Sequence, residues 1–248
     1  MRRVTAFAHR GGAYHPEIEG LENTLAAFTH AVALGYTHLE TDVHLTRDGV
    51  LLAFHDAVLD RVTDRAGAVA DLTLAQIREA RIAGREEVPT LVDLLDAFPQ
   101  ASFNIDLKAS GTPAALAALV EGRGLHDRLV IGSFSRARIR EFRRLTGGRV
   151  ATSADPIEVA AWRVAPTVRL ARLVGDDFTA LQVPYRQSRV TVVTRGFVDR
   201  AHAAGKQVHV WTIDEADEMR ELIGLGVDGI FTDRTDVLKD VLMERGEW

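Results

Sequence analysis

Short apolar runs alternate along the chain with longer stretches in which apolar residues recur at helical spacing. The short runs are rich in β-branched residues and are bounded by glycine, proline or polar residues, which predicts strands. The expected strands cover residues 4–8, 37–43, 102–108, 129–134, 149–153, 180–184, 207–213 and 229–232. Helices are expected between them, over residues 23–34, 113–121, 135–145, 157–173, 194–204, 215–224 and 236–243.

This regular alternation predicts an α/β fold. Eight strand–helix units of roughly 30 residues each favour a parallel sheet closed into a (β/α)8 TIM barrel. The competing architecture is an open doubly wound sheet. It is weakened by the first turn, HRGGAY (9–14), which lacks the G-x-G-x-x-G pattern of a dinucleotide site. Because no linker or low-complexity stretch interrupts the chain, we expect residues 1–248 to form a single domain.

One region breaks the rhythm, because residues 45–101 are nearly twice as long as the other units. The segment TRDGVLLAFHD (46–56) is typical of a hairpin that turns at Asp48 and Gly49. Residues 74–83 and 90–97 have helical patterns. We interpret the region as a small insertion after the second strand. It would lie at the carboxyl end of the barrel, where the active sites of such barrels are found.

Composition supports a folded chain and excludes several chemistries. Of the 248 residues, 46% are hydrophobic and 26% are charged, as in ordinary globular proteins. The chain has no cysteine, which excludes disulfides, thiolate metal sites, iron–sulfur clusters and a cysteine nucleophile. Any metal ligands must therefore be oxygen atoms or imidazoles. The net charge of −5 offers no basic footprint, so no nucleic-acid partner is expected.

The first residues, MRRVTAFAHRGG, resemble a signal peptide only superficially. The apolar stretch 4–8 is shorter than the roughly 7–15 residues of a signal peptide's apolar region. His9 also lies too near the start to leave room for a cleaved leader. There is no run of about 20 apolar residues, so no transmembrane segment is expected. These features favour a cytoplasmic protein and leave its oligomeric state open.

Polar side chains are concentrated on one face of several expected strands. Residues two apart in a strand share a face, which groups His38 with residues 40, 42 and 44, and Asn104 with residues 106 and 108. In a barrel the helices cover the outside and take the apolar face. The polar face must then point inward, and polar residues near the carboxyl ends of strands become candidates for a functional site.

Three carboxylates form the centre of this candidate site. Glu40 and Asp42 share a face of the second strand, and Asp106 lies on the next strand of the barrel. Carboxylates from two neighbouring strands can surround one hard divalent cation, and oxygen ligands favour Mg²⁺ or Ca²⁺. The alternative is an ion-pair network inside the barrel with Lys108, His38 or His44.

His9 and His55 are the candidates for acid–base chemistry. His9 ends the first strand and His55 follows a short strand in LLAFHD (51–56). Histidine titrates near neutral pH, so a pair can supply a general base and a general acid. The commoner role of a single histidine is structural, and position by itself leaves both readings open.

Four more residues could form the rest of a binding site. Arg10 and Lys108 could bind a phosphoryl group and stabilise its charge in the transition state, or they could simply pair with nearby carboxylates. Trp211 and Phe134 end strands where they could line an apolar wall, although aromatic residues at such positions are more often part of the core.

The order of these motifs resembles that of the glycerophosphodiester phosphodiesterase family. The shared motifs are AHRGG (8–12), ENTLAAF (22–28), LETDVHLTRDG (39–49), FHD (54–56), LDRVTD (59–64), VPTL (88–91), FNIDLK (103–108), GSF (132–134), VWTID (210–214) and GVDGIFTD (226–233). Each motif is weak by itself, but their order and spacing are specific and cover nearly the whole chain. The resemblance also implies a (β/α)8 barrel with an insertion after the second strand.

The resemblance implies a role for each candidate in turn. The histidines match the family's catalytic pair, Arg10 and Lys108 match its phosphate-contacting cations, and Trp211 matches an aromatic residue near the substrate's alcohol. Glu40 and Asp42 match two metal ligands. Asp106 stands where the family usually has glutamate, which bears on the geometry of the metal site more than on the function. Glu22 and Asn23 match a recurrent motif that shapes the first loop, with a direct role possible for Glu22.

The activity implied is metal-dependent hydrolysis of a small-molecule glycerophosphodiester to glycerol 3-phosphate and an alcohol. One divalent cation, Mg²⁺ or Ca²⁺, would be the cofactor, and either water or the neighbouring glycerol hydroxyl would be the nucleophile. Three alternatives stay open. The first is a lysophospholipase D, which a longer apolar groove around the insertion would favour. The second is a non-catalytic phosphodiester-binding barrel. The third is an aldolase with Lys108 as Schiff-base nucleophile.

Overall fold

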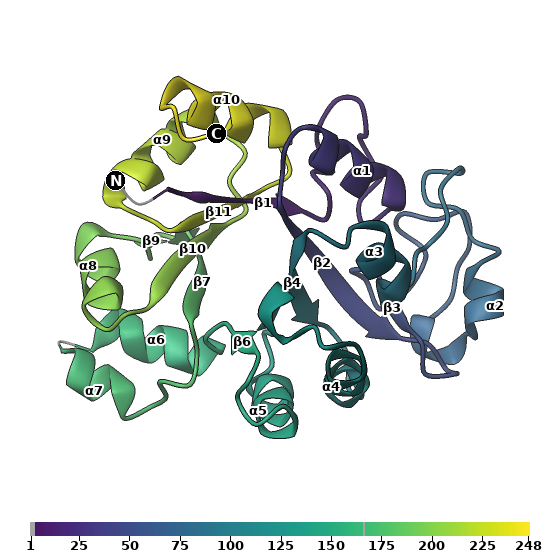
Figure 1. The fold of residues 1–248 in the computed structure, drawn as a ribbon, viewed down its shortest axis with the longest axis horizontal. Helices are drawn as coiled ribbons and strands as arrows, with labels where there is room; N and C mark the ends of the chain where they lie inside the picture. The colour runs from purple at the N-terminus through teal and green to yellow at the C-terminus, as the bar shows by residue number, and fades with distance from the viewer. Residues whose placement is uncertain (1–2, 166) are drawn as a thin grey trace.

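A ring of parallel strands forms the centre of the computed structural model, which describes residues 3–165 and 167–248 (Figure 1). The strands of the ring are β1 (Thr5–His9), β2 (His38–Leu45), β4 (Ser102–Leu107), β5 (Leu129–Gly132), β6 (Ala151–Thr152), β7 (Ala180–Pro184), β10 (Gln207–Trp211) and β11 (Gly229–Thr232). They correspond to the eight predicted strands, with small differences at the ends.

The ring is a nearly closed barrel, as predicted. Its strands are hydrogen-bonded in the order β6-β5-β4-β2-β1-β11-β10-β7. The two ends of this row meet where Ser153 forms a parallel bridge with Ala180. The amide of Ala154 also donates to the carbonyl of Ala180 at 2.9 Å. This short contact brings β6 beside β7 and completes the ring.

Helices wrap the outside of the barrel and cover its apolar face (Figure 1). They are α1 (Leu25–Ala33), α3 (Leu91–Ala97), α4 (Thr112–Arg123), α5 (Arg136–Leu145), α6 (Pro156–Val164), α7 (Val168–Arg172), α8 (Arg195–Ala203), α9 (Ala216–Leu225) and α10 (Thr235–Glu244). Side chains such as Leu39, Val43 and Ile105 leave the strands outward and are fully buried among apolar residues of the helices. The predicted alternation of polar inward and apolar outward positions is therefore confirmed on β2 and β4.

The prediction of one helix over residues 157–173 was wrong. The structure has two helices there, α6 and α7, and Ala165 between them is extended with ψ 132°. A proline follows Ala165 in the sequence, and the residue before a proline disfavours the helical conformation. Residue 166 itself lies outside the described residues.

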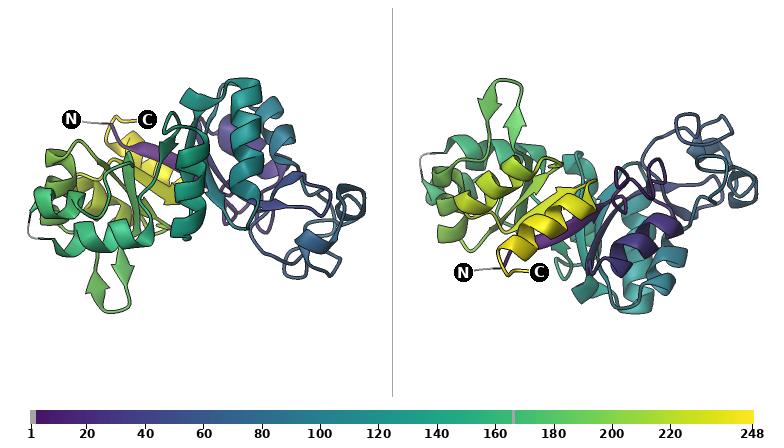
Figure 2. Two further views of the ribbon diagram at one scale, coloured as in Figure 1. Left: turned by 90° about the horizontal axis from the view of Figure 1, so that it is seen from below. Right: turned by 90° about the horizontal axis from the view of Figure 1, so that it is seen from above.

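The insertion after β2 begins with the predicted hairpin. β3 (Leu51–Ala53) runs antiparallel to β2, and the turn between them contains Gly49 with φ +83°. A short 3₁₀ helix (Val69–Asp71) and α2 (Leu74–Ile77) follow. The insertion has an apolar cluster of its own: Leu52, Phe54, Leu59, Val69, Ile77, Ala80, Ile82 and Val88. It extends from one side of the barrel (Figure 2).

The expected helix 74–83 was wrong beyond residue 77. Ile82 forms bridges with Thr63 and Glu86, and Ala83 has φ +49°, so this part of the chain turns back on itself. The expected helix 90–97 is α3, which packs on the barrel core rather than within the insertion. A hairpin that the sequence pattern did not indicate, β8 (Arg186–Gln187) and β9 (Val190–Thr191), projects from the body between β7 and α8 (Figure 2).

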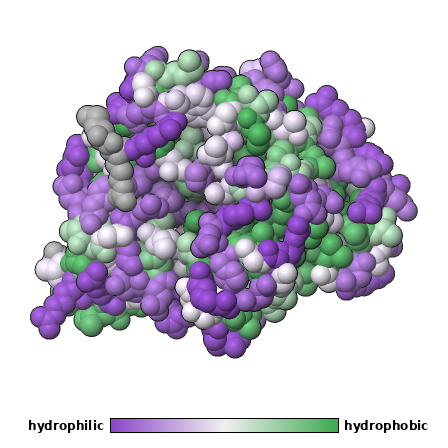
Figure 3. Space-filling model, viewed as in Figure 1, coloured by the Kyte–Doolittle hydropathy of each residue, from purple (hydrophilic) through white to green (hydrophobic). Residues whose placement is uncertain are grey.

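Hydrophilic residues cover most of the face seen in Figure 3, and apolar residues show between them. Across residues 3–165 and 167–248, the helices are too short or too polar to cross a bilayer.

The interior of the barrel holds a histidine that burial keeps neutral. His209 on β10 is buried beside the rings of Phe7 and Phe231, with centroid distances of 5.1 and 6.2 Å. Gln182 and Gln207 are within 3.4 and 3.1 Å of its two ring nitrogens. Burial lowers the pKa of His209 to about 4, from an ordinary value of 6.5.

This lowered pKa predicts a loss of stability in mild acid. Between pH 6.5 and 4 the unfolded chain binds a proton at residue 209 that the folded chain does not bind, so the free energy of unfolding falls as pH falls. The contribution between pH 7 and pH 5 is about 2 kcal/mol. Urea unfolding of wild type and His209→Gln at both pH values measures it. The variant is expected to lose less stability over this interval, and an equal loss in both proteins would contradict the prediction.

Candidate active site

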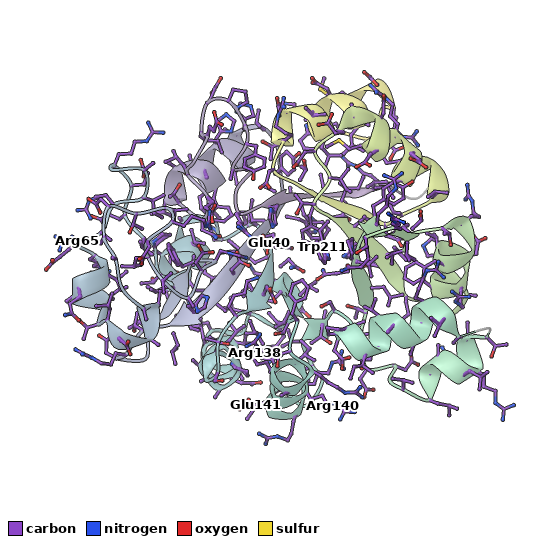
Figure 4. The ribbon with its side chains drawn as sticks, turned by 180° about the vertical axis from the view of Figure 1, so that it is seen from behind. Glu40, Arg65, Arg138, Arg140, Glu141 and Trp211 are labelled. Atoms are coloured by element: carbon purple, nitrogen blue, oxygen red, sulfur yellow. The ribbon has the colours of Figure 1, made fainter. Side chains whose placement is uncertain are left out.

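A cavity of about 620 Å³ opens at the carboxyl end of the barrel strands. Its lining includes nine of the residues singled out from the sequence: His9, Arg10, Glu40, Asp42, His55, Asp106, Lys108, Phe134 and Trp211. Glu22 contacts this lining through Nη1 of Arg10. The labels of Figure 4 place Glu40 and Trp211 near each other at the middle of the barrel. The structure therefore brings together side chains that lie up to about 200 residues apart along the chain.

Strand register explains why the polar side chains meet. His9 pairs with Glu40 between β1 and β2, and Asp42 pairs with Asp106 between β2 and β4. Parallel strands end on the same side of a barrel, and residues in register lie at the same height. Lys108 comes directly after β4, two residues beyond Asp106, and also lines the cavity.

The turn after β1 needs glycine because it packs closely against two helices. Gly11 and Gly12 have φ +89° and +87°. A Cβ atom at Gly11 would lie 2.7 Å from the Cβ of Ala27, and one at Gly12 would lie 2.5 Å from Cγ2 of Thr235. Close packing at these positions fixes the turn against the helices. In this turn, the main-chain amide of Arg10 donates to Oε2 of Glu40 at 3.1 Å.

His9 is held by a carboxylate that the sequence analysis did not single out. Nδ1 of His9 lies 2.9 Å from Oδ1 of Asp233, which directly follows β11. Because an ionised carboxylate only accepts, Nδ1 donates and Nε2 is left for the cavity. Burial by itself would lower the pKa of His9, but the charges of Glu40 and Asp233 and the hydrogen bond to Asp233 outweigh it and raise the pKa.

Asp233 could have been found from the closure of the barrel. It ends the motif GVDGIFTD (226–233), and the last strand of a closed barrel lies beside the first. Ala8 is in register with Thr232, which brings the next residues, His9 and Asp233, to the same height.

Replacing Asp233 with asparagine is expected to lower the pKa of His9. The substitution removes a charge and a charged hydrogen-bond acceptor that favour the imidazolium, while the burial that disfavours it remains. An NMR titration of the imidazole measures the change. Asp240→Asn, at an exposed position on α10, serves as the control. A pKa that stays at the wild-type value in Asp233→Asn would show that this carboxylate does not support His9.

His55 also lines the cavity and has a carboxylate of its own. Its Nδ1 lies 2.5 Å from Oδ1 of Asp56, which again leaves Nε2 for the cavity. Nε2 of His44 lies 3.0 Å from the main-chain carbonyl oxygen of His55. Arg61 binds Asp56 in turn, through Nε at 2.6 Å, and holds the pKa of Asp56 at about 2.

Two cations lie among the carboxylates. Lys108 Nζ is 2.9 Å from Oδ1 of Asp42 and 2.7 Å from Oδ2 of Asp106. Arg10 Nε is 3.2 Å from Oδ2 of Asp42, and its Nη1 is 3.3 Å from Oε1 of Glu22. Burial would lower the pKa of Lys108, but Asp42 and Asp106 raise it overall. A lysine held protonated in this way is a poor Schiff-base nucleophile, which disfavours the aldolase interpretation.

The three carboxylates fit a hard cation by their chemistry, although they are not gathered around one point. Among the residues that the structure describes, no three acidic or histidine side chains are close enough together to hold an ion. Two observations still favour a positive group here. Oδ1 of Asp106 is buried and has no hydrogen-bond partner among the described residues. Burial together with the charge of Asp42 raises the pKa of Glu40. An added cation would meet both demands.

The other half of the cavity is apolar. Phe134 and Trp211 form an edge-to-face pair with ring centroids 5.6 Å apart, and Lys108 Nζ lies 5.7 Å from the centre of the Phe134 ring. Val159 and Ala160 of α6 and Val192 continue this wall. The apolar lining is therefore on the side of α6 and the segment between β7 and α8, rather than around the insertion.

Comparisons with known proteins find a matching family model, similar sequences and similar solved structures. The model of the glycerophosphoryl diester phosphodiesterase family matches residues 9–237. A Mycobacterium tuberculosis protein named "probable glycerophosphodiester phosphodiesterase 2" is 41% identical over 98% of this chain and 92% of its own length. A mouse lysophospholipase D is 28% identical over 95% of this chain and 85% of its own length. A phosphodiesterase of Oleispira antarctica, solved with the product sn-glycerol-3-phosphate, superposes with a TM-score of 0.79 at 25% identity, covering 97% of both chains.

Proposed function

Since the chain belongs to the glycerophosphoryl diester phosphodiesterase family of enzymes, we propose that it hydrolyses glycerophosphodiesters to glycerol 3-phosphate and an alcohol, with His9 and His55 as the acid–base pair. One observation carries the proposal. Two histidines line the same cavity, and each has a carboxylate at Nδ1, so each presents Nε2 to a substrate. One imidazole takes the proton of the nucleophile, and the other protonates the leaving alkoxide.

Arg10 and Lys108 bind the phosphoryl group in this proposal. Both keep their charge, because neighbouring carboxylates raise their pKa values against the effect of burial. Arginine has five N–H donors. Within the described residues, Nη1 of Arg10 donates to Glu22, while Nε lies 3.2 Å from Oδ2 of Asp42 without forming a hydrogen bond. Its remaining donors can therefore bind an equatorial oxygen as negative charge develops in the transition state.

Glu40, Asp42 and Asp106 would hold one divalent cation, Mg²⁺ or Ca²⁺. The proposal is supported by the oxygen-only donor set and by Oδ1 of Asp106, which has no hydrogen-bond partner within the described part of the chain. Such an ion would act as a Lewis acid on a phosphoryl oxygen. With the ion bound, Lys108 is expected to release part of its contact with Asp42 and Asp106 and to turn toward the substrate.

Release of glycerol 3-phosphate tests the proposed function. The purified protein is assayed on the choline, ethanolamine, glycerol and inositol glycerophosphodiesters, with EDTA and with added Mg²⁺ or Ca²⁺. We expect glycerol 3-phosphate from at least one substrate in the presence of a divalent ion. The absence of product from all four substrates under both metal conditions would refute the proposal.

A second candidate, hydrolysis of lysophospholipids at the same bond, is favoured by the apolar half of the cavity. Val159, Ala160 and Val192 could contact a hydrocarbon chain, and the mouse relative named above is a lysophospholipase D. Choline release from lysophosphatidylcholine tests it. Ala160→Trp, which narrows the cavity, should abolish this activity and spare hydrolysis of glycerophosphocholine. Val164→Trp, at a position 77% exposed on the same helix, is the control.

A further inference from the structure

Arg61 lies in the motif LDRVTD (59–64), to which the proposed chemistry assigns no role. Its guanidinium binds two carboxylates at once. Nη1 and Nη2 donate to the two oxygens of Glu22 at 2.7 and 2.6 Å. Nε and Nη2 donate to the two oxygens of Asp56 at 2.6 and 3.1 Å. Both pairings are bidentate, a geometry that the planar guanidinium provides and an ammonium group does not.

Each of these carboxylates contacts a residue of the cavity in turn. Oδ1 of Asp56 accepts from Nδ1 of His55 at 2.5 Å. Oε1 of Glu22 accepts from Nη1 of Arg10 at 3.3 Å. Arg61 is therefore the middle of a continuous chain of hydrogen bonds that runs from His55 to Arg10. The two ends of this chain are a proposed acid–base group and a proposed phosphate ligand.

The chain of contacts also joins two separate parts of the fold. Asp56 and Arg61 belong to the insertion, whereas Glu22 lies in the loop between β1 and α1, 39 residues away in the sequence. His44 contacts the main-chain carbonyl of His55, so the backbone at this position has its own support. The imidazole of His55 is held by Asp56 instead. Arg61 binds the carboxylate of Asp56 and so acts on the imidazole rather than on the backbone.

We propose that Arg61 is a positioning residue, which orients His55 through Asp56 and Arg10 through Glu22. This inference rests on the proposed function. The side chain of Arg61 is 48% exposed, and ion pairs at the surface contribute little to the free energy of unfolding. If Arg61 had only a structural role, its replacement would therefore cause small losses of both stability and turnover. A positioning residue combines a small effect on stability with a large effect on turnover, since small misplacements of reacting groups are costly.

Arg61→Ala is expected to lower kcat/KM for a glycerophosphodiester by about 100-fold with little change in Tm. Arg65→Ala is the matched control. Arg65 lies in the same segment, is 55% exposed and pairs with Glu79 at 3.3 Å. Figure 4 shows it at the outer edge of the insertion, away from Glu40 and Trp211. Turnover by Arg65→Ala should match that of the wild type.

Two further measurements separate positioning from general damage. Guanidinium chloride at millimolar concentration should restore part of the turnover of Arg61→Ala, because the site is open to solvent, while ammonium chloride should not. In a double-mutant cycle, Arg61→Ala combined with Asp56→Asn should be little worse than the more damaging single variant, since both changes release the same imidazole.

Arg61→Lys keeps the positive charge but lacks the planar guanidinium that binds both carboxylates. Its turnover should stay well below that of the wild type, so the inference can be tested even if the alanine variant does not fold.

The inference is overturned if Arg61→Ala retains wild-type turnover, if Arg65→Ala loses as much, or if the effects of Arg61→Ala and Asp56→Asn are additive. These outcomes all require an active wild-type enzyme. The absence of hydrolysis by the wild type would instead refute the proposed function, so the two failures are distinguishable.

Discussion

Alanine at position 9 or at position 55 is expected to lower kcat for glycerophosphodiester hydrolysis by about 10²–10⁴-fold. Each imidazole has a carboxylate at Nδ1 and faces the cavity with Nε2, so each variant loses a proton donor or acceptor in the transition state. KM should change less than kcat, because Arg10 and Lys108 still bind the phosphoryl group. Steady-state kinetics on the best substrate of the panel measure both constants.

The control for these variants is His126→Ala. His126 pairs with Glu121 in the short 3₁₀ helix His126–Arg128, before β5, and does not line the cavity. Its turnover should equal that of the wild type. The assignment of the pair fails if both His9→Ala and His55→Ala hydrolyse the substrate at near-normal rates. If a single variant is inactive, only that histidine is needed for proton transfer.

Removal of the metal is expected to have the second large effect. EDTA should abolish hydrolysis, and added Mg²⁺ or Ca²⁺ should restore it, because Glu40, Asp42 and Asp106 provide oxygen ligands suited to a hard cation. Glu40→Gln should raise the metal concentration needed for half-maximal activity by more than about 100-fold, since even partners of metal ligands contribute about 10–100-fold. Titrating metal-stripped protein with each ion measures this concentration.

Glu79→Gln serves as the control for Glu40→Gln. Glu79 pairs with Arg65 in the insertion at 3.3 Å and is 61% exposed, so its loss should leave the metal requirement unchanged. Full activity of the wild type in EDTA would contradict the metal proposal. It would leave the two histidines, Arg10 and Lys108 to carry the reaction without an ion.

Local sequence patterns were sufficient wherever the decisive interactions are short in range. The alternation along β2 places Glu40 and Asp42 on one face because the side-chain period of a strand is two residues, and the structure has them on the inner face. The turn at Asp48 and Gly49 was predicted for a similar reason, because φ +83° at residue 49 suits glycine. The helix over 157–173 was wrong because the apolar periodicity continues across Pro166 and hides the break between α6 and α7.

The contacts that complete the candidate site depend on residues far apart in the chain. Asp233 reaches His9 across 224 residues because β11 pairs with β1 when the barrel closes. Arg61 reaches Glu22 because the insertion folds back against the loop after β1. No local period carries this information. A carboxylate at the end of a strand looks the same in sequence whether or not a histidine faces it.

The sequence by itself thus determined the strand–helix alternation and the inward polar faces, since both follow from backbone periods of two or 3.6 residues. The order of its motifs, through the resemblance to a known family, gave the candidate residues their expected roles. Only the tertiary structure decided how these residues are paired: Asp233 with His9, Asp56 and Arg61 with His55, and Lys108 between Asp42 and Asp106. The physical reason is that charge interactions depend on distance and burial. Both are set by the closure of the barrel and the docking of the insertion.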